Sequence, residues 1–242
     1  MNAQVELQST IVVSSLNKSF SEMAVLKDID FALDAGGFLT VFGPNGAGKT
    51  TLIRILAILT KPTSGTVSVG GFDVSEHRNK VRGITGVISH DPYLYPDLTA
   101  FENIRFFARM YGVTHAEDRA AEVIAQVGLR HRMYDVVRSF SRGMQQRLAV
   151  ARAVVNDPEV LLLDEPYTGL DQHGAEIFTE LLRGLKDNGR TVVMTTHNID
   201  EGLGLSDRVM IINGGRVVYD DEKKGVEAGE FREIYLSKVG AA

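Results

Sequence analysis

The chain has 242 residues, a formal net charge of -5 and no cysteine. This length suffices to bury a sizeable core, and the lack of cysteine excludes disulfides, thiolate metal sites and a cysteine nucleophile. The negative charge argues against nucleic acid as a partner, because proteins that bind nucleic acids normally carry a basic surface. Neither a signal peptide nor the ~20-residue apolar run of a membrane-spanning helix is predicted.

Apolar and β-branched segments predict a series of strands along the chain. In chain order they are residues 11–20, 25–33, 38–42, 66–69, 84–89, 160–163, 191–196, 208–212 and 216–219. Asn213, Gly214 and Gly215 predict a tight hairpin between the last two. Helix-forming stretches, such as residues 51–56, alternate with the inner segments, which indicates an α/β fold.

The middle of the chain, residues 91–139, lacks strand patterns and is predicted to be helical. Thr99 and Glu102 form a capping box that opens one helix, which Gly112 ends. Its apolar stripe comprises Ile104, Phe107, Ala108 and Tyr111. Residues 114–117 are predicted to cap a second helix, which stops at Gly128. We therefore expect one domain over residues 1–242, with an α/β core at 1–90 and 140–242 and a helical subdomain at 91–139.

A complete phosphate-binding loop follows the predicted strand at residues 38–42. It comprises Gly43, Pro44, Asn45, Gly46, Ala47, Gly48, Lys49 and Thr50, and Thr51 continues into a helix. Strand, glycine loop and helix in this order are the setting that the motif needs. The loop N–H groups and the helix N-terminus bind phosphate oxygens, Lys49 reaches the β- and γ-phosphates, and the Thr50 hydroxyl can ligate Mg²⁺. The chain is therefore predicted to bind a nucleoside triphosphate.

A pair of carboxylates, Asp164 and Glu165, follows four apolar residues at 160–163. The apolar run predicts a buried parallel strand, and open α/β sheets bind ligands at the carboxyl ends of such strands. By itself, an acidic pair could merely end a strand in solvent. Beside a phosphate loop, Asp164 is predicted to hold Mg²⁺ and Glu165 to orient or deprotonate the attacking water. The chain is thus predicted to hydrolyse the triphosphate.

A third motif, residues 140–147, precedes a helix that Ser141 is suited to cap. With this motif the chain resembles the ATP-binding subunits of ABC transporters, whose signature is usually written LSGGQ. The resemblance covers nearly the whole chain and assigns Asp171 to the D-loop, His197 to the switch histidine and Phe20 to the aromatic residue that stacks on adenine. Taken singly, Phe20 is equally suited to a core, His197 to a strand end and Asp171 to a turn.

The resemblance implies a P-loop NTPase core of the ABC ATPase type, with an antiparallel β subdomain and an inserted α-helical subdomain. It also implies ATP and Mg²⁺ as cofactors and two ATP sites, each shared by head-to-tail chains. The signature residues of one chain would complete the site of the other; they are Ser141, Arg142, Gly143 and Met144. Lys49, Glu165 and His197 would carry the hydrolysis, and the metal would lie at Thr50 and Asp164.

The expected partners are a second ATPase copy or paralogue and membrane-embedded permease subunits on separate chains. The surface at residues 91–109 would couple to the permease, and the chain would lie peripherally on the cytoplasmic face of the membrane. This picture is implied by the resemblance alone.

The chain departs from the usual family pattern in two places, the signature and the loop glutamine. Arg142 and Met144 replace the first glycine and the final glutamine of the signature. His90 stands where the family has a loop glutamine that ligates Mg²⁺, and an imidazole suits so hard an ion poorly. We expect His90 to act through a water, or Asp91 to take the metal-side role; alternatively, His90 only senses the coupling interface.

Several features together resemble the haem-exporter ATP-binding subunits of c-type cytochrome biogenesis. They are His90, residues 94–99, the signature region 140–147 and residues 164–171. Exporter subunits for drugs, lipids or polysaccharides share much of this pattern and remain an alternative. A soluble assembly ATPase of the same superfamily is a further one. A chromosome-structure ATPase would carry a long heptad insert before the signature, and the sequence has none.

Overall fold

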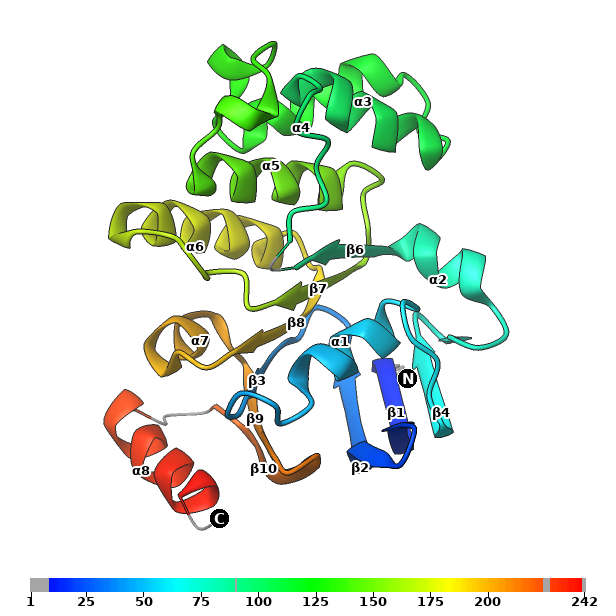
Figure 1. The fold of residues 1–242 in the computed structure, drawn as a ribbon, viewed down its shortest axis with the longest axis vertical. Coiled ribbons are helices and arrows are strands. Elements are labelled where there is room, and N and C mark those ends of the chain that lie inside the picture. The colour runs from blue at the N-terminus through cyan, green and yellow to red at the C-terminus, as the bar shows by residue number, and fades with distance from the viewer. Residues whose placement is uncertain (1–8, 90, 224–226, 241–242) are drawn as a thin grey trace, which may run out of the picture.

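The computed structural model describes residues 9–89, 91–223 and 227–240. Within these ranges ten strands form two sheets, and helices cover the larger one (Figure 1). The predicted α/β class is confirmed.

The larger sheet has the strand order β10-β9-β3-β8-β7-β6 and is parallel except for β10, which pairs antiparallel with β9. Its strands are β3 (Phe38–Phe42), β6 (Thr85–Ile88), β7 (Val160–Asp164), β8 (Thr191–Thr196), β9 (Arg208–Asn213) and β10 (Arg216–Glu222). Every residue of β3, β7 and β8 is buried, as continuous apolar runs predict. Because these three strands are parallel neighbours, their carboxyl ends meet at one edge of the sheet.

The smaller sheet is antiparallel and has the order β2-β1-β4-β5. It comprises β1 (Ser9–Phe20), β2 (Met23–Asp34), β4 (Ser64–Val69) and β5 (Phe72–Asp73). Its apolar face shares one core with α1 (Lys49–Leu56) and with one face of the larger sheet. The antiparallel β part that the resemblance implies is therefore present, and it packs against the helix that follows the glycine loop.

Three helices form the layer at the top of Figure 1: α3 (Ala100–Met110), α4 (Ala116–Gln126) and α5 (Arg142–Val154). Short 3-10 turns at Arg130–Arg132 and Val137–Ser139 connect α4 to α5. The predicted capping box is confirmed, since the Thr99 N–H donates to Glu102 Oε2 at 2.8 Å and the Glu102 N–H donates to Thr99 Oγ1 at 3.1 Å. The layer shares a second core with the other face of the larger sheet.

The predicted cap of the second helix is wrong in detail. The residue before α4 is His115, whose φ of 54° is left-handed and whose side chain makes no capping hydrogen bond. The backbone turn at His115, rather than a hydroxyl of Thr114, therefore leads the chain into the helix. Glu117 and Asp118 in the first turn complement the positive end of the helix.

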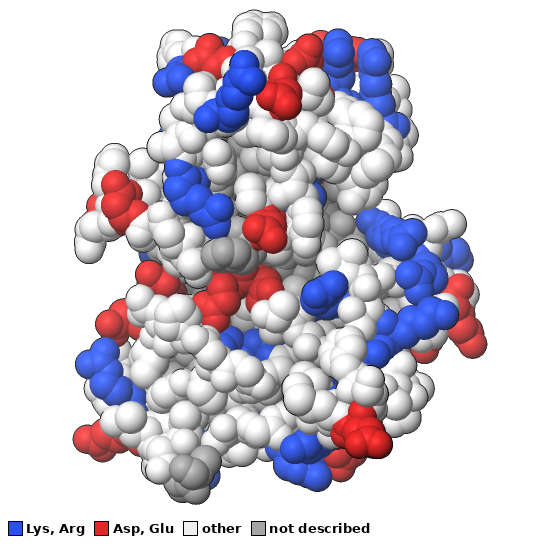
Figure 2. All heavy atoms as spheres, in the orientation of Figure 1, with Lys and Arg blue, Asp and Glu red and all other residues white. Residues whose placement is uncertain are grey.

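The remaining helices are α2 (Arg78–Ile84), α6 (Gln172–Asp187), α7 (Ile199–Leu205) and α8 (Ala228–Val239). Ile84, assigned to a strand by the sequence prediction, is the last residue of α2 instead. No helix in the described ranges is both long and apolar enough to cross a membrane. Figure 2 shows acidic side chains gathered beside a hollow at the centre of one face, with basic side chains over α2 and over the helical layer at the top.

Candidate active site

The glycine loop between β3 and α1 lies at the carboxyl edge of the larger sheet. Gly43 and Gly48 have φ values of 155° and 108°. A Cβ on Gly43 would lie 2.2 Å from the Ile212 carbonyl oxygen, and one on Gly48 would lie 2.6 Å from Leu26 Cδ2. Only glycine fits at these two positions, so the loop folds tightly and presents its backbone.

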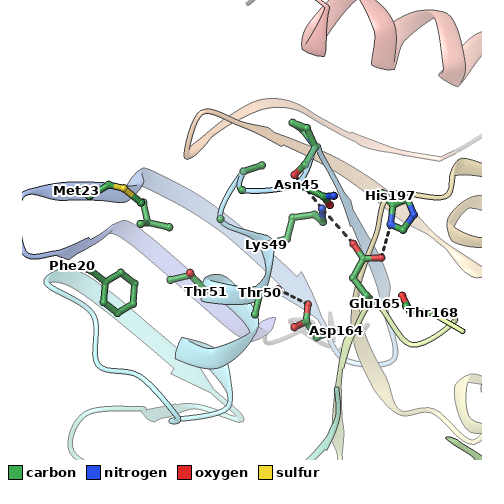
Figure 3. A pocket seen from close by; sticks show the side chains of 15 residues that line it. Phe20, Met23, Asn45, Lys49, Thr50, Thr51, Asp164, Glu165, Thr168 and His197 are labelled. Carbon is green, nitrogen blue, oxygen red and sulfur yellow. Dashed lines mark hydrogen bonds and ion pairs between the residues drawn. The ribbon is translucent and has the colours of Figure 1, made fainter. Parts of the chain in front are cut away.

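Lys49 is the first residue of α1 and is only 6% exposed. Its Nζ donates to the Gly43 carbonyl oxygen at 2.7 Å and to that of Pro44 at 3.2 Å. The same Nζ lies 3.3 Å from Glu165 Oε1. The ammonium group therefore points from the loop toward the end of β7 (Figure 3), and its contacts offset the cost of burying a charge.

Asp164 is the last residue of β7, and its side chain is buried. Two hydroxyl groups donate to its Oδ1, from Thr50 at 3.1 Å and from Thr195 at 2.7 Å. Thr195 pairs with Asp164 in the β7–β8 register, so the sheet itself brings the hydroxyl to the carboxylate. The carboxylate is thus held beside the first turn of α1 (Figure 3).

Glu165 follows β7 with a left-handed backbone, φ 49°. Its N–H donates to the Thr195 carbonyl oxygen at 3.1 Å, which fixes this turn of the chain against β8. Glu165 Oε2 lies 2.8 Å from His197 Nδ1, while Oε1 pairs with Lys49. The carboxylate therefore lies between an ammonium and an imidazole that come from different strand ends (Figure 3).

His197 itself is open to solvent, with 63% of its side chain exposed, whereas the Glu165 side chain is 19% exposed. One turn further along the chain, in α7, burial raises the pKa of the Glu201 carboxyl. His197 opposes this rise and Glu165 adds to it. A second carboxyl group, with a raised pKa, therefore lies near the pair that Glu165 and His197 form.

These residues border one cavity of about 690 Å³, whose lining is drawn in Figure 3. Of the predicted nucleotide-binding residues, those that line it are Phe20, Pro44, Asn45, Gly46, Ala47, Gly48, Lys49, Thr50 and Thr51. Gly43 is buried and is not among them. The cavity volume falls in the range of pockets that enclose ligands of cofactor size.

Phe20 lies at the far end of this cavity from Glu165 and His197 (Figure 3). It ends β1, is 50% exposed, and Lys18 Nζ lies 4.6 Å from its ring centroid. Met23 and Val25, from the start of β2, extend the same wall. The sequence prediction omits both. Their place just after Phe20, across a hairpin turn, is the signal that could have identified them.

The signature residues lie elsewhere. Ser141 is the N-cap of α5, and its Oγ accepts a hydrogen bond from the Met144 N–H at 3.3 Å. None of the four residues 141–144, all of which are described, lines the cavity around Lys49. Asp171 is the N-cap of α6, where its Oδ1 accepts from the Gly174 N–H at 2.8 Å, and it borders a separate groove between α6 and α7.

His90, the residue at the position of the family's loop glutamine, lies outside the described residues. Thr195, which holds Asp164, was not predicted as a site residue. Its position inside an apolar strand hides this role, because only the pairing of β7 with β8 brings it to the carboxylate.

Comparison with known sequences gives related proteins over most of the chain. The profile of the family described as ABC transporter matches residues 26–168. The linearmycin resistance ATP-binding protein LnrL of Bacillus subtilis is 37% identical over 206 residues, which are 84% of this chain and 66% of that protein. The ABC transporter ATP-binding protein NatA of the same species is 35% identical over 221 residues, 88% and 90% of the two chains.

The Nod factor export ATP-binding protein I of Cupriavidus pinatubonensis is 36% identical over 214 residues, 88% of this chain and 66% of that protein. The chain thus spans about two thirds of the length of the linearmycin and Nod factor proteins and most of NatA.

Solved structures agree with the sequence comparison. The ATP-binding subunit of an ABC transporter superposes with a TM-score of 0.84 at 27% identity, covering 95% of this chain and 99% of that one. A dimeric ATP-binding cassette in a post-hydrolysis state, bound to ADP and Pi, superposes with a TM-score of 0.80 at 28% identity, covering 89% and 100%.

Proposed function

We propose that this chain, which belongs to the ABC transporter family, is the ATP-hydrolysing subunit that drives a separate membrane permease. The family membership makes it an ABC ATPase. The observation that carries the residue assignments is the position of Glu165, whose two carboxylate oxygens face Lys49 and His197 at the wall of the cavity.

The glycine loop and Lys49 bind the phosphates of ATP in this proposal. The buried ammonium of Lys49, held by Gly43 and Pro44, exchanges its contact with Glu165 for the β- and γ-phosphate oxygens. Phe20 stacks on the adenine at the far end of the cavity, next to Met23.

Thr50 and Asp164 offer a hydroxyl and a carboxylate oxygen 3.1 Å apart, a donor set that suits Mg²⁺. When bound there, Mg²⁺ would neutralise charge on the phosphates. We keep two alternatives for the position of the loop glutamine: His90 acts through a water, or Asp91 takes the metal-side role.

Glu165 orients or deprotonates the attacking water. His197 Nδ1 holds Oε2 at 2.8 Å, so Oε1 becomes available to the water once Lys49 has turned to the phosphates. His197 is exposed at the mouth of the cavity, where it can also contact the γ-phosphate.

A second ATPase chain completes each site in this proposal. Ser141, Arg142, Gly143 and Met144 lie away from the chain's own cavity, and Ser141 opens a helix whose N-terminus suits an anion. In a head-to-tail dimer these residues would face the partner's ATP, and Asp171 would lie at the interface. The solved relative bound to ADP and Pi is a dimer, which supports this arrangement.

The permease would couple to the helical subdomain, residues 91–139, which is inserted between the core segments 1–90 and 140–242. The contact surface is expected at residues 91–109, on the cytoplasmic face of the membrane. The names of the relatives refer to linearmycin resistance and Nod factor export. They favour an exporter of the drug-resistance or Nod factor kind over the haem exporter that the sequence pattern suggested.

The test is a pull-down of tagged Glu165→Gln from its native membranes in the presence of ATP, followed by mass spectrometry. We expect an integral membrane permease in the ATP sample and its loss in a matched sample with ADP. A permease of cytochrome c maturation would restore the haem assignment. Recovery of soluble partners alone would contradict the transporter proposal and favour an assembly ATPase.

A further inference from the structure

Gln146 links the signature helix to the residue that follows Glu165. It lies in the second turn of α5 and is only 3% exposed. Its Nε2 donates to the Pro166 carbonyl oxygen at 2.8 Å, across 20 positions of sequence. Pro166 is itself buried, so the hydrogen bond is shielded from water and its loss would leave a buried acceptor unpaired.

Two further contacts join the start of α5 to the same segment, residues 166–170. A Cβ on Gly169 would lie 3.4 Å from Arg142 Cγ and 3.5 Å from Arg142 Nε, so the arginine side chain lies against one side of this glycine. A Cβ on Gly143 would lie 3.9 Å from Leu170 Cδ2. The first turns of α5 and residues 166–170 are therefore packed together within one chain.

Two arginines further along α5 form hydrogen bonds to the end of α4 and to the larger sheet. Arg147 Nη1 donates to the Val127 carbonyl oxygen at 3.2 Å, at the end of α4. Arg152 Nη2 donates to the Val87 carbonyl oxygen at 2.7 Å, in β6. A displacement of α5 would therefore be transmitted along the helix, and Gln146 is the residue through which it reaches Pro166.

The segment after Glu165 is short and internally bonded. The Thr168 N–H donates to the Glu165 carbonyl oxygen at 3.2 Å. The Tyr167 hydroxyl lies 3.0 Å from Thr179 Oγ1 and so anchors the segment to α6. A shift of the Pro166 peptide would consequently alter the backbone of Glu165, whose left-handed conformation leaves little freedom.

We propose that Gln146 is a positioning residue that couples the signature helix to Glu165 of the same chain. Contact of the signature with a partner's ATP would then set the catalytic carboxylate of the chain that supplies the signature, so that the two sites of a dimer act together. This inference rests on the proposed shared-site function.

The test compares Gln146→Met with Gln145→Met in the full-length protein. Gln145 is the adjacent residue of the same type, but its Nε2 donates to the Phe140 carbonyl oxygen at 3.3 Å, within the signature itself. We expect Gln146→Met to lower kcat about tenfold, because a misplaced Glu165 raises the barrier and about 1.4 kcal/mol in the barrier is a tenfold change in rate. The KM for ATP should stay within about twofold, because the loop and Lys49 are untouched.

A second readout separates positioning from a merely structural role. With its signature intact and Glu165 misplaced, Gln146→Met should accumulate an ATP-bound dimer in sedimentation, whereas Gln145→Met should not. Should the methionine variant fail to fold, Gln146→Asn keeps a neutral amide but is one methylene shorter, so it withdraws the donor from the Pro166 carbonyl oxygen, and the same criteria apply.

Equal kcat in the two variants, or a loss of kcat accompanied by a loss of dimer formation, would overturn the role of Gln146. The wild type and Glu165→Gln are measured alongside. If the wild type hydrolyses no ATP or Glu165→Gln forms no dimer, the shared-site function fails, independently of Gln146.

Discussion

Glu165 is held by its backbone conformation and by contacts with three other residues of the site. Its left-handed backbone is unfavourable for a residue with a side chain, by about 1–2 kcal/mol. The hydrogen bond from its N–H to Thr195 and the flanking contacts with Lys49 and His197 offset this cost. The strain is therefore retained where it directs a carboxylate into the cavity.

Replacement of Lys49 should reveal its contribution to phosphate binding. Lys49→Ala removes a buried ammonium from the cavity, and we expect ATP affinity to fall by about tenfold or more, since charged hydrogen bonds contribute roughly 1.5–3 kcal/mol. Titration with a fluorescent ATP analogue measures the change, with the exposed Lys61→Ala as the matched control. Undiminished binding in Lys49→Ala would remove the residue from the phosphate site.

The raised pKa of Glu201 predicts a pH-dependent gain of stability on its replacement. Because burial raises the pKa of this carboxyl, the folded state holds its proton more tightly than the unfolded state does. Stability is therefore lost as pH rises through the folded-state pKa. Glu201→Gln should raise the melting temperature at pH 7, and this gain should vanish below the ordinary pKa of a glutamate.

The control for this measurement is Glu233→Gln, at an exposed position of α8. Melting curves recorded from pH 3 to pH 8 give the comparison. A gain that is the same at every pH, or a gain equal to that of the control, would show that the burial of the Glu201 charge does not limit stability.

At the residue scale the sequence pointed to the residues that line the cavity, but not to the residue that holds Asp164 in place. The glycine loop, Asp164, Glu165 and His197 sit in recognisable motifs, and the structure brings them to one cavity. Thr195 could not be found in this way, because its bond to Asp164 depends on the register between two strands far apart in sequence.

Among the elements, α5 carries two roles at its N-cap. Ser141 caps the helix through its Oγ, and in the proposed dimer the same hydroxyl faces the partner's ATP. The helix also shares its core with α3 and α4, so its N-terminus is held in place by the whole helical layer.

The two roles of Ser141 can be separated by substitution. Ser141→Ala should cost about 1 kcal/mol of stability through the lost cap and should strongly reduce hydrolysis while ATP binding to the monomer persists. Ser141→Asn retains a capping side chain, so its melting temperature should recover while hydrolysis stays low. Parallel losses of binding and hydrolysis in both variants would contradict a role across a dimer.

How well each strand or helix could be predicted depends on how much of its surface is buried. The strands β3, β7 and β8 are buried along their whole length, so their apolar runs are unambiguous. The helix α6 is absent from the sequence prediction, although its cap Asp171 and its buried Phe178 and Leu182 provide a signal. The short α7 offers little signal, since it holds two glycines, one of which packs against the Phe42 ring.

On the scale of the whole molecule, the motif residues lie in two separate places. One is the cavity around Lys49, and the other is the helix start at Ser141, which does not line that cavity. A single chain therefore cannot bring the two together in the described conformation. The family resemblance implied this separation, whereas the order of the motifs in the sequence does not by itself say how far apart they lie in the folded chain.

The measurement that tests this account most directly is the oligomeric state of Glu165→Gln with and without ATP, by sedimentation velocity. The substitution keeps the shape of the side chain and removes the base, so we predict retained ATP binding, no turnover and an ATP-dependent dimer. The wild type under the same conditions should form the dimer only transiently. A Glu165→Gln protein that stays monomeric at saturating ATP would contradict the shared-site account.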